Sequence, residues 1–184
     1  MEFEFFILDW IQTHLRHPIL DPIIVFITTL GNAGILWIGL TILLAVRKST
    51  RKTAAALAVA LGLCLLCGNL LLKPLIGRIR PFNVQDAITL LIAAPLDYSF
   101  PSGHTMSSFA AAMVLLLTNR RMGIPAMLLA GLIAFSRMYL YVHYPTDVLA
   151  GLLMGCLFGW LAVRIVQKLH ARRFQGNQQE KPHR

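Results

Sequence analysis

The sequence predicts an all-α integral membrane protein, a helical bundle of about five transmembrane helices plus an N-terminal interfacial helix. Composition is the first reason: 57% of the 184 residues are hydrophobic and only 14% are charged, and the mean hydropathy is +0.65, which leaves too little polar surface for a soluble globule. The second reason is a series of apolar runs of nearly 20 residues or more. The third is that basic residues cluster in short segments between these runs.

Five apolar runs approach or exceed the roughly 20 residues that a helix needs to cross the hydrocarbon core. They cover residues 22–46, 53–72, 102–118, 123–142 and 146–167. Residues 1–18 have an apolar helical face but also carry Glu2, Glu4 and Asp9, so this segment is expected to lie in the membrane interface. It has no basic region or small-residue cleavage site of a secretory signal, and we expect it to be retained.

The chain forms one predicted domain, 1–184, because it has no flexible linker and no repeat at a fixed period. Its direction follows from the rule that cytoplasmic loops are rich in lysine and arginine. Basic clusters occupy 47–52, 120–121 and the polar tail 168–184, so these segments are expected in the cytoplasm. The loop 73–103 and the turn 143–146 are then expected on the extracytoplasmic face of the plasma membrane.

Several other classes of protein are disfavoured. The net charge of +9 does not form the continuous basic stripe of a nucleic-acid-binding surface. The three cysteines, Cys64, Cys67 and Cys156, lie inside apolar runs and are expected to be packing residues. No cluster of carboxylates or histidines on the outer side has the composition of a metal site, so no metal is expected.

The outward loop begins with three cations, Lys73, Arg78 and Arg80, although an outward loop should be poor in them. Lysine and arginine reaching from a helix end to the interface would be the ordinary explanation. The same loop, however, ends in Ser102-Gly103-His104 at the start of the third run. A Ser-Gly pair at a helix N-terminus offers free backbone N–H groups, a hydroxyl and the positive end of the helix dipole. Together these features indicate an anion site.

A third group of polar residues lies around the last outward turn. Arg137 precedes the end of its predicted helix by about six residues, where an unpaired guanidinium would be costly, so it requires an anion. His143 and Asp147 are four residues apart, a spacing that lets the carboxylate accept a hydrogen bond from one ring nitrogen and leaves a lone pair on the other. Taken singly, His143 or His104 would more often be an interfacial histidine.

Phosphoryl transfer needs a cationic cradle, an in-line nucleophile and an acid for the leaving oxygen. Each role has a candidate: Lys73, Arg80 and Arg137 to hold phosphate oxygens, Ser102 and the Gly103 N–H to complete the cradle, His143 to attack phosphorus, and His104 to protonate the leaving group. The polar residues therefore predict a phosphatase site.

The same residues form a three-part pattern: Lys73, six residues, Arg80-Pro81; then Pro101-Ser102-Gly103-His104; then Ser136-Arg137, five residues, His143, three residues, Asp147. This pattern resembles the signature of the type 2 phosphatidic acid phosphatase family over roughly residues 50–167. The resemblance implies a cofactor-free and metal-independent reaction through a phosphohistidine on His143, with Asp147 orienting it and His104 as general acid. Many family members have six spans, and here the N-terminal helix takes the place of the first. Arg78 lies between the matched positions and is left outside the predicted site.

The resemblance also implies a lipid phosphate substrate near the outer leaflet, held among membrane lipids. Undecaprenyl diphosphate is the leading candidate, with phosphatidylglycerophosphate and phosphatidic acid as alternatives. A non-enzymatic phospholipid carrier is a rival interpretation, which the two histidines disfavour. Soluble vanadate-dependent haloperoxidases share the signature, but five apolar runs disfavour that class. Residues 82–99 are expected to form a lid or a re-entrant segment, and the oligomeric state is left open.

Overall fold

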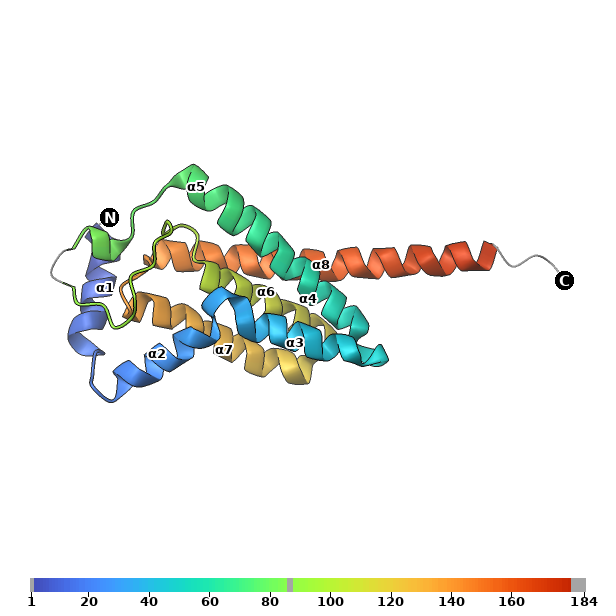
Figure 1. The fold of residues 1–184 in the computed structure, drawn as a ribbon, viewed down its shortest axis with the longest axis horizontal. Helices are drawn as coiled ribbons and strands as arrows, with labels where there is room; N and C mark the ends of the chain where they lie inside the picture. The colour runs from blue at the N-terminus through green and yellow to red at the C-terminus, as the bar shows by residue number, and fades with distance from the viewer. Residues whose placement is uncertain (1, 86–87, 180–184) are drawn as a thin grey trace.

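The computed structural model describes residues 2–85 and 88–179, with side chains as far as residue 172 (Figure 1). Its elements are helical throughout the described residues, which confirms the all-α prediction. The longer helices are α1 Glu2–His14, α2 Leu20–Leu30, α3 Ile35–Val46, α4 Arg51–Leu63, α6 Gly103–Thr118, α7 Arg120–Tyr139 and α8 Pro145–Gln179. The shorter ones are η1 Asn32–Gly34, η2 Lys48–Thr50, the π-helix η3 Cys64–Leu72, α5 Lys73–Ile76 and η4 Pro81–Asn83.

The five predicted spans correspond to helices that differ in regularity. Three segments of the described chain are long and apolar enough to cross a membrane: Lys48–Asn83, Arg120–Tyr139 and Pro145–Arg172. A fourth span consists of α2 together with η1 and α3, bent by 43°. The fifth, α6, is apolar but has only 16 residues. The chain is therefore a multi-pass membrane protein.

The first span is not the continuous helix that its apolar sequence predicted. The helix breaks after Gly31, where Ala33 and Gly34 have positive φ angles of 49° and 68°. Glycine adopts this region without steric cost, whereas alanine does so rarely. The last helix continues to Gln179, so the described part of the polar tail is helical. In Figure 1 its C-terminal half extends beyond the other helices.

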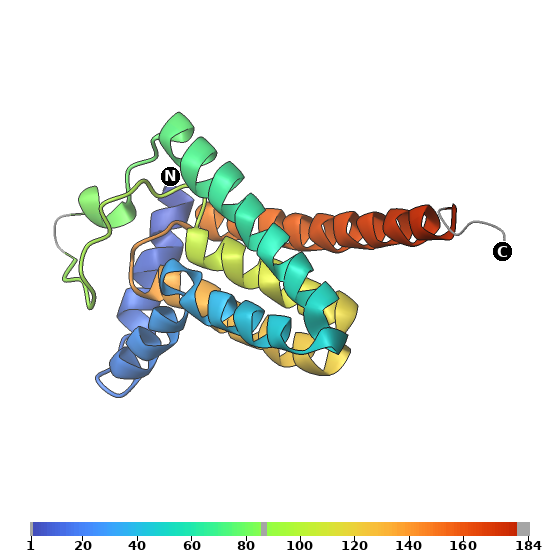
Figure 2. The ribbon, with the colours of Figure 1, turned by 45° about the vertical axis from the view of Figure 1, so that its right-hand side comes forward.

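Helix α6 forms the centre of the bundle, with α7 and α8 packed along it (Figure 2). Its buried residues are mostly small, including Ala110, Ala111 and Ala112. The facing side of α8 carries glycines at positions 151, 155 and 159, and a Cβ added to any of them would lie within 3.0 Å of a backbone atom of the segment Ser102–Ala110. Small residues let membrane helices approach closely where dispersion rather than the hydrophobic effect drives association.

Helix α6 is shorter than a full membrane span. Its sixteen residues cover about 24 Å, less than the roughly 30 Å hydrocarbon core. Arg120 and Arg121 follow Asn119 at its C-terminal end, and arginine favours the headgroup layer. An α6 anchored there would leave its shortfall at Gly103, where the predicted anion site begins.

Helix α1 lies across the end of the bundle where Gly103 is found (Figure 1). It is tied there by hydrogen bonds from Tyr141 to Asp9, 2.6 Å, and from Gln12 to the Tyr139 carbonyl oxygen, 2.6 Å. Phe3 and Phe6 project outward with exposed fractions of 72% and 67%. This apolar outer face supports the predicted interfacial position of α1.

The close approach of α6 and α8 gives a stability prediction. We expect Gly159→Ala to destabilise the folded protein by about 1–3 kcal/mol, because the added methyl would overpack the interface where its Cβ meets the Ala110 carbonyl oxygen at 2.5 Å. Gly131→Ala, in α7, is the matched control: nothing lies within 4 Å of its Cβ, and alanine favours helix. Thermal unfolding of the two purified variants in one detergent measures the difference, and equal midpoints would contradict the packing argument.

Candidate active site

The predicted site residues converge on one cavity at the end of the bundle where α6 begins. It has a volume of about 280 Å³ and draws its walls from the α2–η1 region, the segment 73–97, the start of α6, and the α7–α8 turn. Six of the eight predicted residues line it: Lys73, Arg80, Gly103, His104, Arg137 and His143. The other two, Ser102 and Asp147, are fully buried beside it. Segments more than 60 residues apart in sequence thus supply one polar pocket.

His143 has its two ring nitrogens in different surroundings. Nδ1 lies 3.5 Å from the Asp147 Oδ2 atom, and Nε2 lies 3.2 Å from the Arg80 Nη1 atom. Burial, followed by the positive charges of Arg80, Arg137 and Lys73, lowers the pKa of His143 well below its usual value. The imidazole is therefore neutral at neutral pH, and the nitrogen on the Arg80 side can carry a lone pair toward the cavity.

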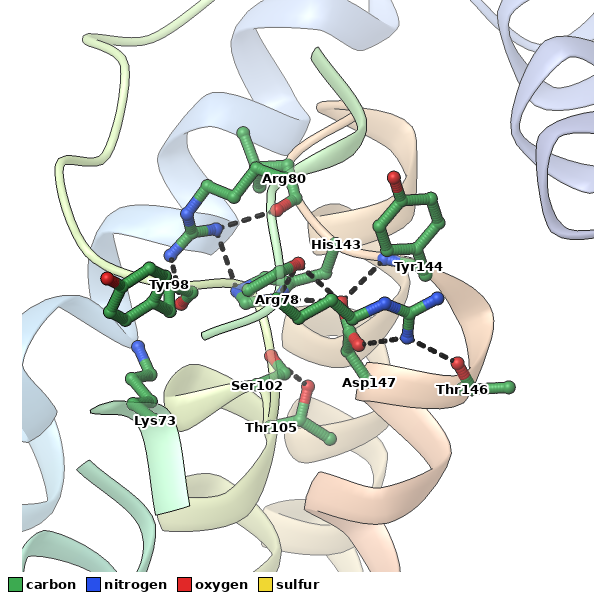
Figure 3. Close-up of polar contacts among 12 residues, drawn as sticks. Lys73, Arg78, Arg80, Tyr98, Ser102, Thr105, His143, Tyr144, Thr146 and Asp147 are labelled. Atoms are coloured by element: carbon green, nitrogen blue, oxygen red, sulfur yellow. Dashed lines mark hydrogen bonds and ion pairs between the residues drawn. The ribbon is translucent and has the colours of Figure 1, made fainter. Parts of the chain in front are cut away.

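Asp147 is held by three donors besides His143 (Figure 3). Its Oδ2 atom accepts hydrogen bonds from the Ser99 hydroxyl, 2.5 Å, and from the Tyr144 backbone N–H, 3.0 Å. Its Oδ1 atom accepts from Arg78 at 2.5 Å. A buried carboxylate with these partners keeps one fixed orientation, so His143 faces a rigid acceptor.

Arg78, which the sequence interpretation left outside the site, belongs to it through Asp147. Its second nitrogen donates to Glu4 of α1 at 2.7 Å, and its guanidinium carbon lies 3.9 Å above the Tyr144 ring. Thr146 links the same groups, since it accepts from Arg78 at 2.7 Å and donates to Glu4 at 2.5 Å. Burial alone would raise the pKa of Glu4, but the bonds from Thr146 and Arg78 lower it. Glu4 is therefore an anion here.

The cations that line the cavity differ in how they are balanced. Arg80 donates to the Asp97 carboxylate at 2.6 Å and to the Val142 carbonyl oxygen at 2.6 Å, and Lys73 forms an ion pair with Asp97. Arg137 donates to the Thr28 hydroxyl at 2.5 Å, while its buried Nε atom has no hydrogen-bond partner among the described residues. A buried, incompletely bonded guanidinium beside a cavity is the kind of group that an anion would satisfy.

Asp97 was not predicted as a site residue, yet its carboxylate forms ion pairs with two of the cations expected to hold phosphate. Burial alone would raise the pKa of Asp97, but the bonds and charges of Lys73 and Arg80 outweigh it and lower this pKa to about 2. Its side chain is nevertheless 55% exposed. Asp97 is therefore an accessible internal anion in the position where a phosphate would compete for the same donors.

The start of α6 is arranged differently from expectation. Ser102 precedes the helix, but its hydroxyl accepts from Thr105 at 3.0 Å and does not line the cavity. Gly103 does line it, and so does His104, whose Nε2 atom lies 2.9 Å from the Asn32 Oδ1 atom. A Cβ on Gly31 would lie 2.7 Å from the His104 ring. The break in the first span therefore fits against His104 and supplies its hydrogen-bond partner.

The predicted cover, residues 82–99, forms a wall of the cavity. Ile92, Ala93 and Pro95 line it, and Leu90 and Leu91 pack with Leu140 and Val142 of the α7–α8 turn. Residues 88–99 contain no helix, so the described part is an irregular cover rather than a helical re-entrant segment. Residues 86–87 lie outside the described residues.

A second cavity continues from the first into the bundle. This groove, of about 530 Å³, runs between the η1–α3 region, the α4–η3 helix and α6. Most of its lining is apolar, including Ile38, Leu61 and Leu65. Both cavities share Lys73, Asp97, Gly103 and His104. A polar cavity that joins an apolar groove suits a molecule with a charged head and an apolar tail.

The chemistry that this arrangement offers is nucleophilic attack on a bound phosphate by a neutral imidazole, with a second histidine lining the same pocket. Among the described residues, no group of three or more His, Cys, Asp or Glu side chains could hold a metal ion. Arg78, Ser99, Asp97 and Asn32 were missed by sequence reasoning. Only Arg78 carried a local signal, as the third cation of an outward loop.

Comparisons with known proteins identify the family of the chain. The PAP2 superfamily matches residues 51–171. An undecaprenyl-diphosphatase of Sulfolobus acidocaldarius is 37% identical over 147 residues, covering 79% of this chain and 70% of the relative. The crystal structure of Aquifex aeolicus LpxE is similar with a TM-score of 0.77 and 29% identity, covering 88% of this chain and 95% of that one. A phosphatidylglycerolphosphate phosphatase of Bacillus subtilis gives a TM-score of 0.66 and 26% identity, covering 92% and 82%. The chain therefore belongs to the PAP2 superfamily and is a membrane-embedded lipid phosphatase.

Proposed function

We propose that this phosphatase removes the terminal phosphate of a membrane lipid phosphate or diphosphate, with undecaprenyl diphosphate as the leading substrate and the monoesters phosphatidylglycerophosphate and phosphatidic acid as alternatives. The observation that carries the chemistry is the placement of His143, with Nδ1 beside Asp147 and Nε2 beside Arg80 at the cavity. The similarity to an undecaprenyl-diphosphatase supports the choice of substrate.

The reaction uses two steps at phosphorus. The His143 Nε2 lone pair attacks the terminal phosphorus, the bond from that phosphorus to the bridging oxygen breaks, and His104 gives this oxygen a proton. Water then attacks the phosphohistidine, loses a proton to His104, and releases inorganic phosphate. Lys73, Arg80 and Arg137 stabilise the charge on the phosphoryl oxygens in both steps.

The lipid can remain in the membrane during both steps. Its head enters the cavity while its tail occupies the apolar groove between α3, α4 and α6. Basic residues cluster in the loops 47–52 and 120–121, at the other end of the helices from the site. Because such loops are usually cytoplasmic, this clustering supports an extracytoplasmic position for the site. A lipid carrier that only binds headgroups would need the cations but not a fixed His143–Asp147 pair.

The phosphohistidine step predicts that His143→Ala loses at least about 10³-fold in kcat, because the nucleophile is removed. Wild-type activity is expected to survive EDTA. The measurement is phosphate release from undecaprenyl diphosphate, phosphatidylglycerophosphate and phosphatidic acid by purified protein in detergent, with and without EDTA. Cys156→Ala, in α8 and outside the cavity lining, controls for activity lost through mutagenesis and purification alone. Activity that persists in the His143 variant, or disappears with EDTA, would refute this mechanism.

Arg78 is expected to be a positioning residue. Arg78→Ala should lower kcat roughly tenfold or more, since Asp147 loses a charged hydrogen-bond partner, with little change in KM. Glu4→Gln should show a smaller loss of the same kind, and Glu2→Gln, an exposed acid in the same turn of α1, should show none. Arg78→Lys is expected to restore part of kcat. A purely structural role would instead lower the unfolding temperature and leave the kcat of the surviving folded protein unchanged.

Asp97 should compete with the substrate phosphate. We expect Asp97→Asn to lower KM, and the inhibition constant of inorganic phosphate, by about threefold to fivefold, a modest change because this half-exposed ion pair is screened by solvent. The pKa of about 2 keeps Asp97 charged throughout the neutral range, so the ratio between variant and wild type should be constant from pH 5 to 8. A higher KM in the variant would mean that Asp97 arranges the cations rather than competing for them.

A further inference from the structure

Asn69 is a polar side chain in the otherwise apolar run 53–72, and the phosphatase chemistry above does not use it. It lies in the π-helix η3, is exposed, and lines the groove. None of the hydrogen bonds among the described side chains involves it. An amide within the hydrocarbon region costs free energy unless a polar group satisfies it, so the groove beside Asn69 is expected to receive a polar ligand.

The surroundings of Asn69 are those of an anion-binding position. Lys73 follows it by one helical turn and also lines the groove. The Asn69 Oδ1 atom is 2.9 Å from where a Cβ on Gly103 would lie, so its amide sits against the N-terminal end of α6. Ser107, one turn further along α6, lines the same groove. A buried ammonium, an amide, a hydroxyl and the first residue of a helix therefore line one groove.

This place lies where the leaving group of the proposed reaction must go. The attacked phosphorus belongs beside His143 in the smaller cavity, and His104, which lines both cavities, gives its proton to the bridging oxygen. The group bonded to the other side of the bridging oxygen then extends into the groove past Lys73 and Asn69. In a lipid diphosphate the following group is the second, lipid-side phosphate, whereas in a phosphate monoester it is an uncharged carbon.

We propose that Asn69, Lys73 and Ser107 form a second phosphate subsite that binds the lipid-side phosphate of a diphosphate. This inference rests on the proposed function and deepens it, because the subsite selects lipid diphosphates over lipid monophosphates. Lys73 contributes to both phosphate positions, since it lies at the junction of the two cavities. Asn69 and Ser107 contribute only to the second position and so determine specificity.

The test compares Asn69→Leu with wild type on two substrates that share a tail, farnesyl diphosphate and farnesyl monophosphate, in one detergent. We expect kcat/KM for the diphosphate to fall at least about tenfold, the loss of a hydrogen bond to a charged group, and that for the monophosphate to change less than about twofold. Cys67→Ala, two residues earlier in η3 and outside the groove lining, should change neither. Equal losses on both substrates, or no loss on either, would overturn the subsite.

Inhibition gives a second measurement that does not depend on turnover of the monophosphate. Wild type should bind a farnesyl methylenebisphosphonate at least about tenfold more tightly than a farnesyl phosphonate, and Asn69→Leu should lose that preference. Equal inhibition constants in wild type would overturn the subsite while leaving the phosphatase proposal intact. Failure of the phosphatase proposal is distinguishable, because it would appear as wild-type protein that releases phosphate from neither substrate.

Discussion

Holding four cations together at one end of a membrane bundle, three of them buried and Arg78 partly buried, is the constraint on which the remaining structure depends. Lys73, Arg78, Arg80 and Arg137 lie where the dielectric is low and an uncompensated charge is costly. The described residues compensate them unequally: Arg78 pairs with Glu4 and Asp147, and Lys73 and Arg80 share the single carboxylate of Asp97. Among the described residues, Arg137 has only the Thr28 hydroxyl as a side-chain partner. Four cations face three carboxylates, so the site keeps an excess positive charge that favours the binding of a phosphate.

The need for carboxylates explains why segments outside the bundle core are held so firmly at this end. The acids come from three separate segments, Glu4 from α1, Asp97 from the irregular cover and Asp147 from α8. Tyr141 fixes α1 through Asp9, and the apolar residues of the cover pack on the α7–α8 turn. An N-terminal helix that composition identifies only as interfacial therefore also supports the orientation of Asp147 beside His143, through Glu4 and Arg78.

Sequence patterns predicted the helices and the residues around the cavity because both are specified by residues that lie close together in the sequence. Apolar runs long enough to cross a bilayer specify helices, and closely spaced cations, glycine and histidines specify a phosphate site. The break at Ala33 and Gly34 was not predicted, because the long apolar run 22–46 was given more weight than the glycines and the asparagine at 31–34. Arg78 was left aside because its partners Glu4 and Asp147 lie 74 and 69 residues away, and such pairings leave no local pattern. Asp97 and Asn32 were missed for the same reason.

The unequal compensation of the cations also bears on how a turnover ends. When inorganic phosphate leaves, Lys73 and Arg80 would be stranded in a low-dielectric pocket if no other anion were present. Asp97 is half exposed and carries a charge at neutral pH, so it can take the place of the departing oxygens and be displaced again by the next headgroup. Arg137 has no such carboxylate among its described partners. We therefore expect Arg137 to bind phosphate without a competing carboxylate among the described residues, and Asp97 to weaken the binding of product phosphate by the other two cations.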